Sequence, residues 1–339
     1  MTSDSVTNET DLLRDALSAR LAKVTASEVW PALGEMGLHG LTLGEGEGGA
    51  GADLSTAAAA AGVLGDLCLP APLIEAHIAA RLLSGVAGEA AARVRGALVA
   101  GERIGLIGLE PRLNDEVRIA DEKLTGTARL VIDGDSASQF ILIDQEKSTL
   151  WLLARDAATS ITAYPTLDGR MAADVTFDSV PAEALGGDAA RITQARDEAI
   201  ALIASEAAGL MTSLVRQTAD YARQREQFGQ VIGSFQVVQH RIVDMHIAAR
   251  RAGAIARAAV AACNNPLGPE RTRTISAAKA TINQTGRFVG QNAVQLHGGM
   301  GMTEELPVGR YFKRLTMIET QLGSTHDHVR HYAESMATA

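Results

Sequence analysis

Two short motifs carry the residues of this 339-residue chain that are best suited to bind a ligand. The first reads Arg-Glu-Gln-Phe-Gly from Arg225 to Gly229, and the second reads Gln-Leu-His-Gly-Gly-Met-Gly from Gln295 to Gly301. Arginine offers a charge-assisted fork to a phosphate, and phenylalanine offers a flat apolar surface. Glycines allow close approach of the backbone, while amides such as those of Gln236 and Gln295 both donate and accept. This combination suits a dinucleotide.

The longer phrase from Tyr221 to Gln236 reads Tyr-Ala-Arg-Gln-Arg-Glu-Gln-Phe-Gly-Gln-Val-Ile-Gly-Ser-Phe-Gln. Together with the Gly-Gly-x-Gly turn after His297, it resembles the C-terminal helical domain of the acyl-CoA dehydrogenase family. The resemblance implies FAD as the cofactor, with these positions reaching across a subunit interface to the adenosine and pyrophosphate of a flavin held mainly by a neighbouring subunit. The residues that it implies for this role are Arg225, Gln227, Phe228, Ile232, Gln236, Gln295, Gly298 and Gly299.

A simpler interpretation exists for each motif taken alone. Arg225 could be a surface charge, and the glycines could merely end a helix. We favour cofactor binding because both motifs occur at the family's spacing and within a matching domain order.

The catalytic base of the family is missing from its usual position. In acyl-CoA dehydrogenases, a carboxylate just before a Gly-Thr or Gly-Ser pair removes the α-proton of the acyl thioester while the β-hydrogen leaves as hydride to the flavin. Here residues 317–325 read Met-Ile-Glu-Thr-Gln-Leu-Gly-Ser-Thr, which places Leu322 at that position. Leucine cannot accept a proton, so we assign no catalytic residue to this chain.

Some family members carry the base on the first helix of the C-terminal domain instead. By analogy that position falls at Ala199, and the family's substrate-holding arginine falls at Ile200. Glu198 lies one residue away, which turns its side chain by about 100° around a helix. We expect Glu206 and Glu319 to be solvated or salt-bridged helix residues. A relocated base such as Glu198 or Glu206 remains an alternative.

The middle of the chain departs from the family pattern. The family usually presents Thr-Glu-Pro, then Gly-Ser-Asp, and later a Trp-Ile-Thr strand against the flavin ring. Residues 109–116 read Leu-Glu-Pro-Arg-Leu-Asn-Asp-Glu, so that Glu110 and Pro111 remain while the Gly-Ser-Asp phrase and the tryptophan are absent. We therefore expect this chain to bind a flavin poorly by itself.

The sequence predicts an α+β fold of the acyl-CoA dehydrogenase type with three domains. Residues 1–102 have helical periodicity and form the N-terminal helical domain. Residues 103–188 contain short apolar runs separated by Gly, Asp and Ser, which predict a small middle β domain. Residues 189–339 form a C-terminal four-helix bundle, because apolar residues recur every three or four positions over 242–263 and 275–296.

Composition excludes several classes of function. The formal net charge of -9 and the pI near 5.4 argue against a nucleic-acid partner. The polar, acidic start lacks the features of a secretory signal, which predicts a cytoplasmic protein. The apolar run from Ala57 to Leu64 is too short to span a membrane. We expect a turn between helices at residues 44–51, and we interpret Cys68 and Cys263 as packing residues.

Histidines cluster near the C-terminus at positions 326, 328 and 331. Two histidines at i and i+3 can share a metal ion, but a solvated helix explains them more simply and flavin dehydrogenation needs no metal. We therefore predict no metal site. His297 is interpreted as a packing or flavin-edge residue, and His240 as a helix-interface residue.

These observations favour a non-catalytic subunit of a heteromeric FAD-dependent acyl-CoA dehydrogenase. The chain resembles the smaller subunit of actinobacterial heteromeric enzymes that act on CoA thioesters of steroid side chains. The resemblance implies a larger catalytic subunit in an α2β2 heterotetramer, an acyl-CoA substrate, and electron-transferring flavoprotein as the acceptor. Two alternatives remain, namely a self-sufficient homotetramer with a relocated carboxylate and a non-enzymatic scaffold that retains the motifs as leftovers.

Overall fold

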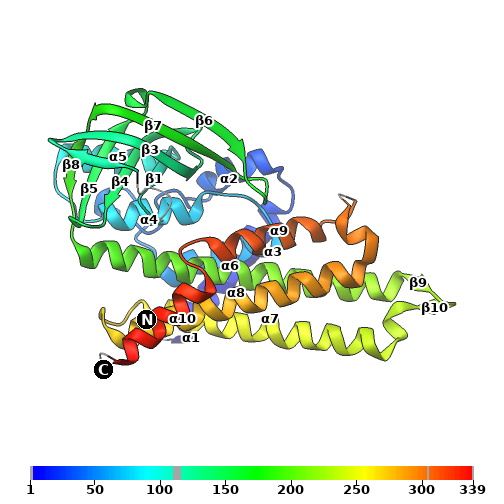
Figure 1. Ribbon diagram of the computed structural model, residues 1–339. Coiled ribbons are helices and arrows are strands. Elements are labelled where there is room, and N and C mark those ends of the chain that lie inside the picture. Colours follow the sequence, from blue (N-terminus) through cyan, green and yellow to red (C-terminus); the bar gives the residue numbers. More distant parts are fainter. Residues whose placement is uncertain (1–2, 110–115, 304, 338–339) are drawn as a thin grey trace. The chain divides into compact units, whose positions relative to one another are not determined.

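The computed structural model describes residues 3–109, 116–303 and 305–337 of the chain (Figure 1). The chain forms two compact units, which are described separately. The first contains residues 1–22, 58–69 and 200–339, and the second contains residues 23–57 and 70–199. This grouping follows contacts in space, so the predicted division at residues 102/103 and 188/189 stays a prediction. Glu110 and Pro111 lie outside the described residues.

Short helices make up the N-terminal part of the second unit. They are the 3-10 helix η1 (Ala26–Glu28), α2 (Val29–Glu35), the 3-10 helix η2 (Glu45–Glu47), α4 (Leu73–Leu83) and α5 (Glu89–Val99). The glycine-rich stretch around η2 is a turn, as the sequence predicts, and Gly48 and Gly51 both have positive φ. The Glu47 carboxylate holds this turn in place, because it accepts hydrogen bonds from the Gly85 backbone amide at 2.9 Å and the Ser84 hydroxyl at 3.1 Å.

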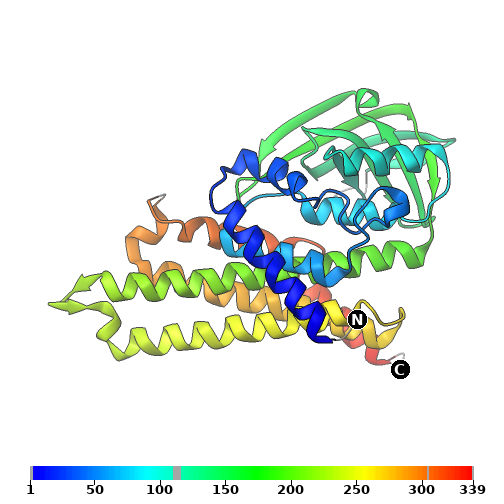
Figure 2. The same ribbon diagram turned by 180° about the vertical axis from the view of Figure 1, so that it is seen from behind.

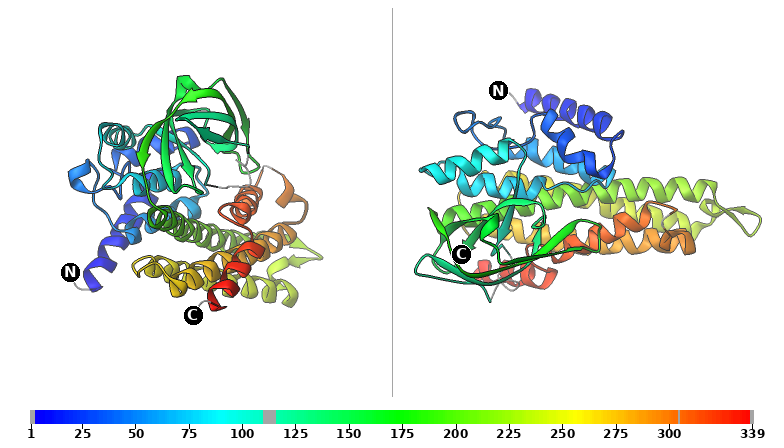
Figure 3. Two further views of the ribbon diagram at one scale, coloured as in Figure 1. Left: turned by 60° about the vertical axis from the view of Figure 1, so that its left-hand side comes forward. Right: turned by 90° about the horizontal axis from the view of Figure 1, so that it is seen from above.

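Two four-stranded sheets complete the second unit (Figure 3). The first has the order β1 (Arg103–Ile107), β4 (Ala137–Asp144), β5 (Thr149–Ala154), β8 (Glu183–Gly186), and the second has the order β2 (Arg118–Ala120), β3 (Lys123–Ile132), β7 (Met171–Pro181), β6 (Ser160–Pro165). The β1–β4 pair is parallel and the other pairs are antiparallel. Both sheets contribute to one apolar core, in which the Phe140 and Phe177 rings meet edge to face at 5.9 Å.

The first unit is built from long helices. They are α1 (Ser3–Leu21), α3 (Leu54–Leu67), α6 (Ala189–Gln224), α7 (Gln236–Ala262), α8 (Pro269–His297), α9 (Val308–Thr320) and α10 (Thr325–Ala337), with α3 and α6 contributing residues to both units. Helix α8 lies beside α7, α9 and α10. The predicted apolar faces are confirmed, since Met245, Ala249 and Ala252 of α7 and Ile275 and Ala278 of α8 are buried.

Helices α3 and α6 approach each other through glycines within the first unit. A Cβ atom at Gly65 would lie 2.0 Å from the Glu206 carbonyl oxygen, and one at Gly209 would lie 2.1 Å from the Gly62 carbonyl oxygen. Only glycine permits this approach of two backbones. The crossing places Glu206 against α3 and fixes the rotation of α6 about its axis.

One described helix is long and apolar enough to cross a membrane by length and composition alone. It is α6, whose most apolar 18-residue stretch has a mean hydropathy of 1.4. Because 78% of that stretch is buried inside the fold, it matches the core helix of a folded domain, and it is weak evidence for a membrane span. The fold class predicted from the sequence, with helical N-terminal, β middle and helical C-terminal parts, is confirmed.

Candidate functional site

A two-stranded hairpin at the end of α6 and α7 presents the first motif (Figure 2). Strands β9 (Glu226–Gln227) and β10 (Gln230–Val231) pair with Gln227 opposite Gln230. The two residues between them, Phe228 and Gly229, both have positive φ, at 56° and 79°. A two-residue loop of this kind is a type I′ turn, and a bulky residue in it stores backbone strain of about 1 kcal/mol. This turn holds the Phe228 ring 92% exposed.

Arg225 lies at the base of the same hairpin. Its carbonyl oxygen accepts a hydrogen bond from the Ile232 amide at 2.8 Å, which closes the loop, while its side chain is exposed. Among the residues that the structure describes, its guanidinium makes no hydrogen bond or ion pair. The guanidinium is therefore available to a ligand outside this chain.

The second motif begins where α8 ends. The helix stops at His297, and Gly298 follows with φ of 60°. His297 is buried, and its Nδ1 atom donates to the Ala293 carbonyl at 2.8 Å, while burial lowers the pKa of its ring. Of the two roles that the sequence suggested for His297, packing or contact with the flavin edge, its burial favours packing.

The structure brings the two motifs to one end of the helical bundle. The Tyr221 ring stacks on the His297 ring with centroids 4.3 Å apart, and the Tyr221 hydroxyl donates to the His297 carbonyl at 3.4 Å. The turn after α8 leaves Gly298 and Gly299 exposed, with no atom within 4 Å of the place that a Cβ would occupy. Gln295 is exposed on the last turn of α8.

The remaining predicted cofactor residues lie on the hairpin and at the start of α7. Gln227 is exposed and its amide donates to the neighbouring Glu226 carbonyl at 2.7 Å, while Ile232 is half-buried. Gln236 begins α7 and lies 3.5 Å from the ring of His240. The prediction of His240 as a helix-interface residue is wrong, since its side chain is exposed on α7.

Leu322 lies in the short loop between α9 and α10 and is 3% exposed. Its φ of 55° is in the left-handed region, and its carbonyl accepts a hydrogen bond from His328 Nε2 at 2.9 Å. The prediction of a solvated histidine cluster is therefore wrong for His328, which is buried because it caps this loop. His326 is exposed and His331 is half-buried. Among the described residues, no group of three or more His, Cys, Asp or Glu side chains is arranged to hold a metal ion.

A fully buried lysine that the sequence analysis missed holds the same loop. Lys279 Nζ donates to Asn283 Oδ1 at 2.8 Å, to the Ile318 carbonyl at 2.9 Å and to the Gly323 carbonyl at 3.1 Å. A cation satisfies the free carbonyls at the end of α9 and interacts favourably with the helix dipole. The signal was available, because Lys279 lies four residues after Ile275 and three before Ile282, on the apolar face of α8.

Glu198 is buried in a polar cluster within the second unit. Its Oε2 atom lies 2.9 Å from His77 Nε2 and 2.8 Å from Arg81 Nε, and its Oε1 accepts from Gln194 at 3.0 Å. Burial alone would raise the pKa of Glu198, but the hydrogen bond and charge of His77 and the charge of Arg81 hold it below its ordinary value. His77 is oriented on its other side by Thr42 at 3.0 Å.

Glu206 is held in a buried ion pair within the first unit. Arg314 of α9 donates to it through two nitrogens, with Nε–Oε1 at 2.6 Å and Nη2–Oε2 at 2.7 Å. Glu319 pairs with Arg287. The prediction of salt-bridged acids is confirmed for both glutamates. The Arg314 guanidinium therefore occupies both oxygens of the Glu206 carboxylate.

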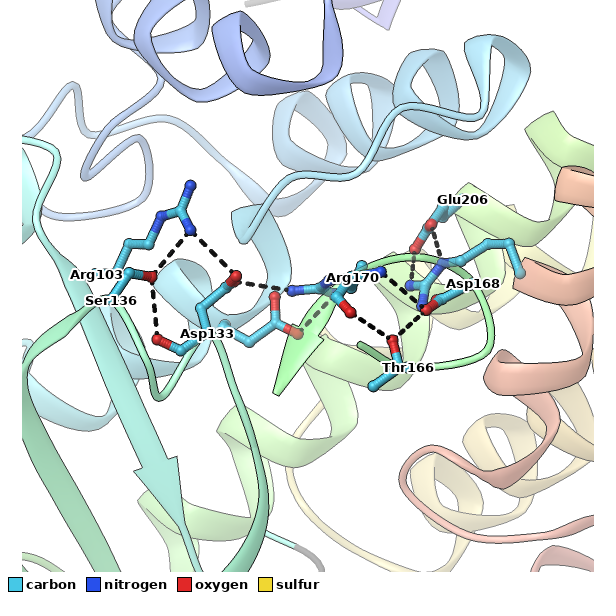
Figure 4. A network of polar contacts seen from close by, with 9 residues as sticks. Arg103, Asp133, Ser136, Thr166, Asp168, Arg170 and Glu206 are labelled. Atoms are coloured by element: carbon cyan, nitrogen blue, oxygen red, sulfur yellow. Dashed lines mark hydrogen bonds and ion pairs between the residues drawn. The ribbon is translucent and has the colours of Figure 1, made fainter. Parts of the chain in front are cut away.

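A second buried network that the sequence did not reveal ties the β strands together in the second unit (Figure 4). Arg170 reaches Asp133 Oδ2 at 3.2 Å and Glu75 Oε1 at 3.0 Å, while Arg103 reaches Asp133 Oδ1 at 3.2 Å. Burial raises the pKa of Asp133, and the charge of Glu75 adds to this rise while that of Arg170 opposes it. These charged side chains pair with one another and so stabilise the fold of this unit.

The chain belongs to the acyl-CoA dehydrogenase family. Residues 9–93 match the family's N-terminal domain and residues 191–337 match its C-terminal domain. The chain is 30% identical over 288 residues to the acyl-CoA dehydrogenase IpdE2 of Mycobacterium tuberculosis, covering 83% of this chain and 77% of that protein. It is 28% identical over 342 residues to the IpdE2 of Mycolicibacterium smegmatis, and the match covers 96% of this chain and 98% of that protein.

Solved structures share the fold. The ChsE4–ChsE5 complex from Mycobacterium tuberculosis contains a chain that matches with a TM-score of 0.83 and 21% identity, covering 100% of this chain and 99% of that one. A variant of the Tcur3481–Tcur3483 steroid acyl-CoA dehydrogenase matches with a TM-score of 0.80 and 24% identity. This match covers 99% of this chain and 98% of that one. The family is one of FAD-dependent oxidoreductases.

The exposed residues at the end of the bundle fit one half of an FAD molecule. The Arg225 guanidinium, which pairs with no described residue, suits a pyrophosphate, and the open backbone at Gly298 and Gly299 admits a ligand at close range. The exposed Phe228 ring, which meets the Phe235 ring edge to face at 6.2 Å, offers a flat surface to a base. These residues suit the nucleotide end of the cofactor.

Proposed function

We propose that this chain is the non-catalytic subunit of a heteromeric FAD-dependent acyl-CoA dehydrogenase. Its helical bundle contacts the adenosine and pyrophosphate of a flavin that a larger partner subunit holds at the ring. The partner also supplies the catalytic glutamate. The observation that carries the proposal is a contrast between two residues. Arg225 is exposed at the hairpin and pairs with no other described residue, whereas Leu322 is buried where the family carries its base.

The exposure of the motif residues supports a ligand shared with another chain. A site that enclosed its own cofactor would line a concave pocket. Here Arg225, Gln227 and Phe228 project from a hairpin at the end of two helices. Such a projection suits residues that complete a site on a neighbouring subunit.

The contacts of the two acids that were considered as relocated bases support the absence of a base. Glu198 is held by His77 and Arg81, and Glu206 is gripped by Arg314. A general base needs a lone pair that is free to face the substrate. Side chains of this chain already contact both oxygens of Glu198 and of Glu206, so these two acids are poor candidates for that role.

The named relatives support the assembly of this chain into a heteromeric enzyme and suggest a substrate class. One similar structure is a two-protein complex, ChsE4–ChsE5, and another is a steroid acyl-CoA dehydrogenase with two named components. From these likenesses we propose an α2β2 heterotetramer that acts on a steroid-derived acyl-CoA and passes electrons to electron-transferring flavoprotein. The chain's acidic composition accords with a cytoplasmic enzyme that binds no nucleic acid.

In the proposed complex, bound FAD would accept the hydride that leaves the β-carbon of the acyl thioester. This chain would act only by positioning. Arg225 would neutralise pyrophosphate charge, Phe228 would cover a flat ring, and Gln236 and Gln295 would offer amide hydrogen bonds. The stacked Tyr221 and His297 would keep the two motifs in register.

Activity of this chain alone, compared with its activity after coexpression with a longer relative, tests the proposal. The isolated chain is expected to show no dehydrogenation of a steroid side-chain CoA thioester with an artificial electron acceptor. Coexpression with a longer acyl-CoA dehydrogenase from the same organism, chosen because it retains the glutamate before its Gly-Thr or Gly-Ser pair, is expected to give activity. Turnover by the isolated chain would refute the proposal.

A Leu322→Glu variant sharpens this test, with Leu322→Gln as the isosteric control. We expect neither variant to dehydrogenate a thioester without a partner, because the flavin-ring contacts of the middle region are also missing. Activity of the glutamate variant alone would mean that a complete pocket exists in this chain.

A further inference from the structure

Thr42, His77 and Glu198 form a hydrogen-bonded chain inside the second unit. The Thr42 hydroxyl lies 3.0 Å from His77 Nδ1, and His77 Nε2 lies 2.9 Å from Glu198 Oε2. His77 belongs to α4 and Glu198 to α6, while Thr42 lies on the turn between α2 and η2. A hydroxyl, an imidazole and a carboxylate in this order are the arrangement by which enzymes activate an oxygen nucleophile.

The Glu198 carboxylate fixes the tautomer of His77. The pKa of Glu198 lies below its ordinary value, so the group is ionised at neutral pH and can only accept hydrogen bonds. His77 Nε2 must therefore carry the proton that it donates to Glu198. A neutral imidazole has one donor and one acceptor nitrogen, which leaves the lone pair of Nδ1 facing the Thr42 hydroxyl. This is the state in which His77 can take a proton from Thr42.

Burial along the chain suits a nucleophile at its Thr42 end. His77 and Glu198 are each 5% exposed, whereas Thr42 is half-buried. The acid and the imidazole are thus shielded from water, and the hydroxyl lies nearest to the surface. A substrate would approach from the side of Thr42.

The turn that carries Thr42 also offers two backbone amides. The Leu43 amide donates to the Gly40 carbonyl at 2.9 Å and closes the turn. The amides of Thr42 and Gly44 donate to no group in the described part of the chain. The amide of the nucleophile itself and a second amide close by are typical donors to the oxyanion that forms in acyl transfer.

The sequence of this turn agrees with the same chemistry. Residues 40–44 read Gly-Leu-Thr-Leu-Gly, which is the glycine spacing of the G-x-S-x-G nucleophile turn of hydrolases with threonine in place of serine. Glycine is needed at position 40, because its φ is 64° and a Cβ would lie 2.8 Å from Val99 Cγ2. The hydrolase turn joins a strand to a helix, whereas this turn lies between helices. The contacts of Thr42 therefore carry the inference, and the motif only agrees with them.

We infer that Thr42 is the nucleophile of a second site, one that hydrolyses small acyl esters or thioesters. His77 is its general base, and Glu198 is the residue that positions His77. Thr42 Oγ1 forms a bond to the acyl carbonyl carbon while its proton passes to His77 Nδ1. The bond to the leaving alcohol or thiol then breaks, and that group takes the proton from His77.

Water completes the reaction. His77 takes a proton from a water molecule, whose oxygen attacks the acyl-Thr42 ester. The acid product leaves, and the proton returns to the Thr42 hydroxyl. The sequence of steps uses no flavin and no companion chain, so it does not rest on the proposed function.

Reaction of the full chain with p-nitrophenyl acetate tests the inference. We expect a burst of about one p-nitrophenolate per chain, and mass spectrometry of the digested protein should find the acetyl group on Thr42. Thr42→Val should lower turnover by about 100-fold or more, whereas Thr42→Ser keeps a hydroxyl and should remain active. Thr56→Val is the matched control, because Thr56 is also half-buried but its hydroxyl donates to Asp53 at 2.7 Å. It should keep full turnover.

The tautomer of His77 tests the positioning role of Glu198. A glutamine amide at this position can donate to His77 Nε2, which moves the ring proton to Nδ1. Glu198→Gln should therefore slow acetylation by about 100-fold or more, and NMR of the imidazole nitrogens should show the proton on Nδ1. Slow acetylation with an unchanged tautomer would overturn the positioning role.

Two results would overturn the inference as a whole. One is acetylation of lysine, cysteine or exposed histidine side chains while Thr42 stays unmodified. The other is wild-type turnover by Thr42→Val. Labelling of the wild-type chain does not depend on the folding of any variant, and circular dichroism checks the fold of each variant. Failure in this assay leaves the proposed function untouched, because neither flavin nor a companion takes part in it.

Discussion

The Tyr221 ring stacks on the His297 ring at 4.3 Å, and this contact joins two residues that are 76 positions apart in the chain. Tyr221 lies near the end of α6, four residues before the first motif, and His297 ends α8 directly before Gly298. The pair thereby sets the distance between Arg225 and the glycine turn. Neither ring is itself a cofactor ligand in this account.

Removal of the Tyr221 ring should reduce flavin retention in the reconstituted complex. Tyr221→Ala loses an aromatic contact of about 0.5–1.5 kcal/mol and frees the hairpin to move. Tyr221→Phe loses only the long hydrogen bond to His297 and should retain flavin normally. Flavin absorbance after gel filtration measures both variants. Equal retention by all three proteins would mean that the stack has no part in holding the site.

Arg225→Ala should weaken flavin binding by about 10- to 100-fold, which corresponds to the loss of a charged hydrogen bond. Arg223→Ala is the matched control, because Arg223 lies two residues away but is already paired with Asp220 at 2.6 Å. Flavin release upon dilution of the complex gives the two dissociation constants. A complex whose flavin is insensitive to Arg225→Ala would favour the scaffold alternative, in which the motif is a leftover.

Glu206→Gln should destabilise the chain by about 3–5 kcal/mol, because it removes the bidentate partner of a buried guanidinium. Glu319→Gln breaks the more exposed pair with Arg287 and should cost less than about 1 kcal/mol. Urea unfolding monitored by circular dichroism compares the two. If Glu206→Gln were as stable as the wild type yet abolished turnover by the pair, Glu206 would be acting as a base.

The Glu198 cluster should make stability depend on pH in the acid range. The pKa of Glu198 is lowered in the folded state, so its stabilisation is fully present above the unfolded-state pKa of about 4.3 and is lost as pH falls through the folded-state value. Glu198→Gln should remove this part of the acid destabilisation. Urea unfolding of both proteins from neutral to acid pH measures the difference. Parallel stability curves would mean that folding does not lower the pKa of Glu198.

Local periodicity was sufficient to predict the helical part of the fold. The apolar faces of α7 and α8 and the glycine turn after His297 follow from spacing within one helix. The parallel β1–β4 pair could not be predicted in this way, because Gly105 and Phe140 meet only through long-range packing. Strands β2, β6 and β8 lie at the edges of their sheets, and short edge strands carry little apolar signal in a sequence.

At the site, the sequence mainly failed to predict which polar side chains are buried. His328 was expected in solvent because its helix is amphipathic, yet the carbonyl of Leu322 needs a donor and His328 provides one. Lys279 lies in an apolar face for the same reason, as it satisfies carbonyls at the end of another helix. These hydrogen bonds form between different helices, and a single sequence does not reveal which helix end lies beside a given side chain.

The flavin content of the purified chains tests the central claim most directly. Visible absorbance and protein concentration give moles of flavin for each chain. The account predicts almost none in this chain alone and about one per pair after coexpression with the companion, falling when Arg225 is replaced by alanine. A full equivalent of flavin in this chain alone, with turnover of an acyl-CoA, would contradict it.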